Sequence, residues 1–293
     1  MNLDTIHELF LDGSIQAAFS LLKEYQSSQS DSLELMILEW EMKLFLGHYS
    51  ELQERISSDL KKFRKDNRSV SEPKNSGIQN KKLTLEGLDG LEEEWQELLI
   101  GLQKRQQLMT DSEPSWFDPP SIHLQYRWKA IQNLRKKKYR KAQEQLDRAD
   151  MRVPELTGFL DGSGFTELRD SDDRFASILE VLLGDSYLWI EWEKIHKIRL
   201  LPANNLRDRY VRPILLELHN RQSYEGWLPL LYPDSQNHDN SLVVIGEMCE
   251  WDAHPAGPIF CWGCKQLNID SELYPFADIT QLEFRPQLAP IAQ

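Results

Sequence analysis

The sequence of 293 residues is poor in cysteine, and its cationic residues are outnumbered by its acidic ones. Three cysteines, an odd number, argue against a disulfide scaffold and favour a reducing compartment. Lys and Arg total 34 against 47 Asp and Glu, a net charge of −13 that disfavours a fold-wide basic surface for nucleic acid. There is also no long uncharged apolar run and no cationic start followed by an apolar segment. We therefore expect a cytoplasmic protein that neither binds nucleic acid nor inserts into a membrane.

Motifs of known catalytic chemistry are missing as well. The sequence has no Gly-rich phosphate loop, no Gly-x-Ser-x-Gly turn and no His-Glu-x-x-His helix. Its seven histidines are scattered, so no nucleophile, base and orienting group can be assembled from neighbouring positions. The sequence predicts no catalytic residue, no cofactor and no enzymatic activity.

An internal repeat is present in the first half. Residues 11–18 align with residues 45–52 at an offset of 34 residues, which is the period of tetratricopeptide (TPR) repeats. In each copy a glycine, Gly13 or Gly47, is expected to turn the chain between two helices. The pattern returns at residues 137–142, with Lys137 in place of the glycine. We therefore predict a TPR-like solenoid of helical hairpins.

Helical periodicity supports this prediction and sets its limits. Leu35, Leu38, Met42 and Phe45 recur on one helical face. The pattern is lost in residues 61–82, which contain eight basic and two acidic residues and are interpreted as a flexible basic insertion. The alternative is a basic arm that binds nucleic acid or lipid headgroups. The helical pattern resumes from Leu85 and ends with Pro154 and the glycines that follow, so we place the domain boundary near residue 155.

The second half is expected to contain strands. Short apolar runs separated by Gly, Pro and Asn predict strands at residues 187–190, 242–245, 227–231 and 279–284, whereas residues 174–183 and those from Ile195 onward suggest helices or turns. The predicted fold is thus multidomain: an α-helical domain at residues 1–155 and a smaller α+β domain with a mostly antiparallel sheet at residues 156–293.

An ordered series of short motifs in this second half resembles the ImpE/TagJ (SciE-type) family of accessory proteins of bacterial type VI secretion. The helical first half also fits the TPR-like domain of that family. The motifs that carry the resemblance are residues 165–174, 178–181, 187–190, 206–208, 228–229, 231–235, 246–247, 250–251, 265–266 and 279–284, with Pro202.

The resemblance implies a non-catalytic function and a partner. Family members bind the small sheath subunit (TssB-type) of the type VI contractile apparatus through an N-terminal helix of that subunit, and modulate assembly of the sheath or its recycling by the ClpV-type unfoldase. TPR-like hairpins form concave grooves suited to such a helix. The aromatic residues that we predict to line the groove are Trp40, Phe45, Tyr49, Trp128 and Tyr139.

An acidic cluster after the first predicted motif allows two interpretations. Asp170, Asp172 and Asp173 could hold Mg²⁺ or Ca²⁺ and serve a metal-dependent hydrolase. The alternating signs of Arg169 and Arg174 favour instead a structural network of ion pairs whose carboxylates cap a helix starting near Arg174. We expect Arg207 and Asp208 to belong to the same network.

The three cysteines allow three interpretations. Cys261 and Cys264 have the spacing of a zinc-binding pair, which Cys249 and His254 could complete. A redox dithiol would usually open a helix after a strand, and the prolines and glycine at positions 255–258 suggest a loop instead. Structural cysteines are the favoured interpretation, and metal analysis would decide between the three.

Overall fold

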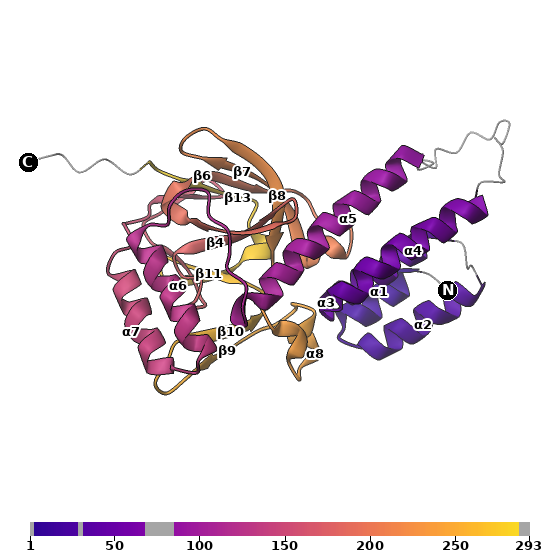
Figure 1. The fold of residues 1–293 in the computed structure, drawn as a ribbon, viewed down its shortest axis with the longest axis horizontal. Helices are drawn as coiled ribbons and strands as arrows, with labels where there is room; N and C mark the ends of the chain where they lie inside the picture. Colours follow the sequence, from indigo (N-terminus) through magenta and orange to yellow (C-terminus); the bar gives the residue numbers. More distant parts are fainter. Residues whose placement is uncertain (1–2, 29–31, 68–84, 287–293) are drawn as a thin grey trace, which may run out of the picture.

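The computed structural model describes residues 3–28, 32–67 and 85–286, with helices in the first half and strands in the second (Figure 1). The predicted fold class is confirmed: helical hairpins precede a mostly antiparallel β region. The helices of the first half are α1 (Leu3–Leu11), α2 (Ile15–Ser28), α3 (Leu33–Phe45), α4 (Tyr49–Asn67), α5 (Leu85–Gln106), α6 (Ile122–Arg135) and α7 (Tyr139–Asp150), and a 3-10 turn η1 (Gln107–Met109) follows α5.

The turns of the three predicted repeats have the same backbone conformation. Gly13 and Gly47 have φ angles of +81° and +71°, in the left-handed region that glycine adopts without steric cost. Lys137 takes the same conformation with a φ of +54°, although it carries a side chain. The hairpins α1–α2, α3–α4 and α6–α7 are therefore built on one type of turn.

Helix α3 lies at the centre of the helical part. Its predicted stripe, Leu35, Leu38, Met42 and Phe45, is buried. The opposite side of the helix is buried in part as well, since Trp40 and Leu44 are inaccessible to solvent. This helix therefore packs on two sides, which explains its nearly continuous apolar sequence.

The basic insertion predicted at residues 61–82 begins later than expected. Helix α4 continues to Asn67, and Arg64 in its last turns pairs with Asp89 (2.6 Å) and Glu92 (3.1 Å) of α5. Residues 61–67 are thus helical, and Arg64 fastens this last part of α4 to the next helix. The remainder of the predicted insertion lies outside the described residues.

The second half folds into antiparallel sheets. Eight strands form one sheet in the order β2-β1-β13-β6-β7-β8-β4-β5, three form the sheet β12-β11-β3, and two form the hairpin β9–β10. The strands are β1 (Gly158–Leu160), β2 (Ser163–Phe165), β3 (Leu168–Asp170), β4 (Ile178–Leu183), β5 (Ser186–Glu191), β6 (Ile195–Leu200), β7 (Val211–Leu218), β8 (Ser223–Pro229), β9 (Cys249–Ala253), β10 (Ile259–Gly263), β11 (Gln266–Ile269), β12 (Glu272–Pro275) and β13 (Gln281–Phe284).

Three of the local predictions for this half were wrong. Residues 178–183 and 195–200 are strands β4 and β6, and no helix begins at Arg174. Residues 242–245, predicted as a strand, belong mainly to the short helix α8 (Ser241–Val244), whose first turn is capped by the side chain of Asn240. The remaining segments are short 3-10 turns: η2 (Trp192–Lys194), η3 (Arg207–Arg209), η4 (Ser235–Asn237) and η5 (Phe276–Asp278).

Helix α5 connects the two halves in space. It runs beside α4 at one end and reaches the sheet at the other, while α6 and α7 lie along the β region (Figure 1). One continuous hydrophobic core extends through both parts. The predicted division at residue 155 remains a prediction. Within the described residues, no helix is long and apolar enough to cross a membrane.

Candidate functional site

The β region encloses a fully buried set of charges centred on Glu180 of β4. Arg105 at the end of α5 donates two hydrogen bonds of 3.0 Å to the Glu180 carboxylate, and Lys265 Nζ lies 2.6 Å from Glu180 Oε2. Lys265 also lies 3.4 Å from Asp170 Oδ2, whose second oxygen accepts a hydrogen bond from Tyr232 (2.7 Å). Every carboxylate in this set thus has a cation within reach, as buried charges require.

The charges decide the protonation of the buried acids. Burial alone would raise the pKa of Glu180, but Arg105 and Lys265 outweigh burial and lower this pKa to about 2. Burial raises the pKa of Asp170, and its single, longer ion pair with Lys265 opposes that rise only in part. Glu180 is therefore the anionic centre of the set.

Two neighbouring aspartates, Asp172 and Asp173, accept hydrogen bonds from the backbone of strand β10. Asp172 pairs with Arg174 (2.7 Å) and its Oδ2 accepts the N–H of Cys261 (2.8 Å). Asp173 pairs with Arg169, and its Oδ2 accepts the N–H of Ile259 (2.7 Å).

These two carboxylates therefore cap strand β10, where the sequence had suggested a helix N-terminus. Asp170, Asp172 and Asp173 each have their own partners, and in the described part of the chain no group of three His, Cys, Asp or Glu side chains could hold a metal ion.

Arg207 and Asp208, expected in the same network, lie in a different cluster. Arg207 pairs with Glu94 of α5 (2.8 Å), and its guanidinium lies 5.3 Å from the ring centre of Trp95 and 4.4 Å from that of Trp227. It lies 3.6 Å from Asp208. The prediction of one network is thus corrected: these residues fasten η3 to α5 and β8.

A buried acid of α3 completes this second cluster. Glu41 is 4 % exposed, and its carboxylate faces the backbone N–H groups of Leu206 and Arg207. Burial raises the pKa of Glu41 to about 7, although the charge of Arg207 opposes the rise. Glu41 therefore changes charge near neutral pH at the contact between the helices and the β region.

The predicted partner-binding aromatics divide into two groups. Trp40, Phe45 and Tyr49 are buried in the protein's own core. Trp40 donates a hydrogen bond to Asp59 (3.0 Å), and Phe45 packs edge-on against Tyr210 with 5.0 Å between ring centres. The hydroxyl of Tyr49 is hydrogen-bonded to that of Tyr210. In this structure these three side chains line no open groove, because aromatic residues at helical spacing fill the space between helices.

Trp128 and Tyr139 are only half-buried. Trp128 lies among Trp116, Trp189 and Arg135, whose guanidinium is 4.9 Å from its ring centre. Tyr139 stacks on His254 with 4.0 Å between ring centres. A role for these two residues in partner binding stays a prediction.

The three cysteines are free thiols that lie close to one another. Hydrogen bonding to Cys261 and Cys264 raises the pKa of Cys249, and the hydrogen bond from Cys249 lowers the pKa of Cys264. His254, proposed as a fourth zinc ligand, stacks on Tyr139 and accepts the N–H of Ala256 (3.1 Å).

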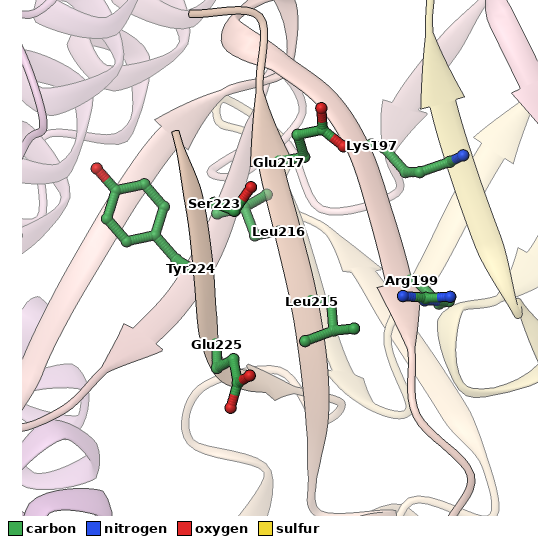
Figure 2. Close-up of a pocket in the computed structure, with 8 residues that line it drawn as sticks. All are labelled: Lys197, Arg199, Leu215, Leu216, Glu217, Ser223, Tyr224 and Glu225. Atoms are coloured by element: carbon green, nitrogen blue, oxygen red, sulfur yellow. The ribbon is translucent and has the colours of Figure 1, made fainter. Parts of the chain in front are cut away.

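The described residues form several surface hollows, one of about 720 Å³ beside residues 150–157 and 166–169 among them, and two others bear on partner binding. The first, about 280 Å³, lies on the outward face of β6, β7 and β8 (Figure 2). Its charges are mixed, since Lys197 and Arg199 come from β6 while Glu217 and Glu225 come from β7 and β8. An open, charge-balanced sheet face of this kind favours no particular ligand.

The second hollow, about 460 Å³, lies between helix α1 and the β region, and we call it the α1–η3 groove. Its apolar lining includes Leu11, which is half-buried, and Leu206 and Ile245, which are buried. Polar and further small side chains surround this lining: His7, Ala203, Asn204, Asn205, Arg209, Arg212, Gly246, Glu247, Ala277 and Asp278. The motifs at residues 206–208 and 246–247 supply Leu206, Gly246 and Glu247 of this lining. The groove itself was not predicted, because its other wall, α1, lies more than 190 positions earlier in the chain.

Comparisons with known proteins support the resemblance seen in the sequence. Residues 162–283 match the model of the ImpE protein family. The chain is 25% identical over 134 residues to the type VI secretion system accessory component TagJ of Pseudomonas aeruginosa. That match spans 46% of the chain and 46% of TagJ, less than half of either. The predicted resemblance to the ImpE/TagJ family is thereby confirmed, on matches that each cover part of the chain.

The fold also occurs in a solved structure. The crystal structure of protein VPA1032 from Vibrio parahaemolyticus superimposes with a TM-score of 0.81, covering 97% of this chain and 98% of that one. The two sequences are 16% identical, so this likeness concerns the fold alone.

Proposed function

From an ImpE-type β region joined to helical hairpins, we propose that this protein is a non-catalytic accessory component of a bacterial type VI secretion system, acting in the cytoplasm of a Gram-negative cell. The similarity to TagJ over 134 residues is the observation that carries this proposal. The engagement of Asp170, Asp172 and Asp173 by their own basic and hydroxyl partners supports a structural role for the acidic cluster.

The proposed partner is the small sheath subunit (TssB-type), held through the amphipathic N-terminal helix of that subunit. Through this contact the protein would modulate assembly of the contractile sheath or its recycling by the ClpV-type ATPase. Helix recognition needs an apolar floor for the buried face of the helix and polar groups that set its orientation.

The α1–η3 groove meets both requirements. Leu11, Leu206 and Ile245 provide the apolar lining, and Arg209 and Glu247, which pair with each other at 2.7 Å, stand at its rim. A partner helix bound there would contact the helical hairpins and the ImpE region at once. This arrangement would explain why the two parts occur in one chain.

The test is a titration of the full-length protein with a fluorescent peptide that copies the N-terminal helix of the sheath subunit. We expect Leu11→Glu to weaken binding at least about tenfold, because it places a charge in the apolar lining. The rim variant Arg209→Glu, at an exposed position, should weaken binding less and change its salt dependence.

Tyr139→Ala is the matched control, because Tyr139 belongs to the α6–α7 hairpin, the other predicted binding position for the partner helix. Loss of binding in Tyr139→Ala, with Leu11→Glu unaffected and all variants folded, would move the partner site to the α6–α7 hairpin. The absence of any binding to the unmodified protein would contradict the proposed partner itself.

A further inference from the structure

The hairpin β9–β10 has one edge that is capped and one that is open. On the capped edge, the N–H groups of Ile259 and Cys261 are bound by Asp173 and Asp172, and the N–H of Gly263 by Ser235 Oγ (2.7 Å). Strand β9 pairs only with β10 among the described strands. The unprotected edge of this hairpin therefore belongs to β9.

The register shows which groups this edge presents. Since Ile259 and Cys261 direct their N–H groups away from β9, the hydrogen-bonded pairs between the strands are Phe260–Asp252 and Trp262–Glu250. The backbone N–H and C=O groups of Trp251 and Ala253 then point away from β10. No partner for either N–H is found within the described residues.

Residues 251–253 of β9 have exposed side chains, and the two faces of the strand differ in chemical character. Trp251 is 68% exposed, and Ala253 beside it on the same face is exposed too. Asp252 is exposed on the opposite face, where Glu250 is half-buried and accepts a hydrogen bond from Asn240 (3.1 Å). An added strand would therefore meet an apolar row on one face and two carboxylates on the other.

The carboxylates of Glu250 and Asp252 also argue against pairing of this edge with β9 of a second copy of the protein. Two β9 strands pairing antiparallel about Trp251 would place Glu250 of each copy opposite Asp252 of the other. Parallel pairing in register would place each acid beside its own equivalent. Like charges directly opposite one another destabilise a strand pair.

We propose that β9 is a strand-addition site for an extended segment of a partner protein in which basic and apolar residues alternate. Main-chain hydrogen bonds to Trp251 and Ala253 would hold the segment, lysine or arginine side chains would face Glu250 and Asp252, and apolar side chains would cover Trp251. This site differs from the α1–η3 groove and does not depend on the sheath subunit.

The experiment measures the fluorescence anisotropy of a labelled octapeptide of alternating lysine and valine titrated with the full chain. An octapeptide of alternating glutamate and valine serves as the charge control. We expect the lysine peptide to bind and Ala253→Pro to weaken it at least about fivefold, since proline removes an outward N–H but is tolerated on an edge.

Charge reversal gives the sharper result. Asp252→Lys should weaken the lysine peptide about fivefold and improve binding of the glutamate peptide, whereas Glu24→Lys on the exposed face of α2 should change neither. Equal binding of the lysine peptide to all variants would overturn the proposal, because it would show attraction by net charge alone. A concentration-dependent dimer of the unmodified protein that Ala253→Pro abolishes would also overturn it and assign the edge to a second copy.

Discussion

Among single residues, Glu41 links stability to pH most directly. Its carboxyl group is neutral in the folded protein below about pH 7 and would ionise near pH 4.5 in the unfolded chain. The folded state thus binds the extra proton between these values, and its stability falls as pH rises through that window.

We predict that Glu41→Gln removes this dependence. The free energy of unfolding of the unmodified protein, relative to Glu41→Gln, should fall by about 2 kcal/mol between pH 5 and pH 8. Urea unfolding of both proteins at several pH values measures the difference. A constant difference across this range would show that Glu41 stays in one protonation state.

At this scale the sequence predicts the ion pairs of Asp172 and Asp173 with the neighbouring arginines, but not the buried charges around Glu180. Arg105, Glu180 and Lys265 are far apart in the chain, so no local motif joins them. One signal was available: Arg105 continues the apolar stripe of Leu98 and Leu102 on α5, and a cation on a buried helical face requires a buried anion. Among the aromatic candidates, Trp40, Phe45 and Tyr49 are covered by the protein's own core, because helical periodicity identifies a buried face without saying what covers it.

At the scale of elements, the repeated turn makes a matched pair of predictions possible. Gly47→Ala should cost about 1–2 kcal/mol, because a Cβ is disfavoured at φ +71° and would lie 2.8 Å from Gln236 Cγ. Lys137→Gly should instead be neutral or stabilise by up to about 1 kcal/mol, because glycine adopts the positive φ of this turn without the steric cost that the lysine Cβ imposes. Thermal or urea unfolding checks both, and destabilisation of equal size at both sites would contradict the shared turn.

Elements with clear periodicity were predictable, whereas short apolar runs were predictable only in part. The stripe of α3 follows from side-chain spacing, and the apolar runs at residues 187–190 and 279–284 correctly predicted strands β5 and β13. Residues 242–245 form an apolar run too short to distinguish helix from strand, and the Asn240 cap with Gly246 at φ +77° determines the helical outcome. Strand β6 was missed because its outward residues are long and charged, which suits a helix surface equally well.

For the whole molecule, the contact between Arg105 and Glu180 is central. We predict that Arg105→Met destabilises the protein by about 3–5 kcal/mol, since it leaves Glu180 buried with only Lys265 as a cationic partner. The adjacent Lys104 is only half-buried and pairs with the more exposed Asp185 at 3.5 Å, so Lys104→Met should cost less than about 1 kcal/mol. Calorimetry of both variants tests this, and similar melting temperatures would show that Arg105 is not needed for folding.

The position of Arg105 also bears on whether the segment that matches the ImpE model can fold without the helices before it. Residues 162–283 contain the Glu180 carboxylate but not the arginine that donates two hydrogen bonds to it. Without the helices, this segment would expose the surface of β4 and β5 against which α5 packs. Glu180 would also lose one of its two cationic partners, because only Lys265 lies within the segment. A fusion or excised fragment would therefore have to include a helix that places a guanidinium beside Glu180.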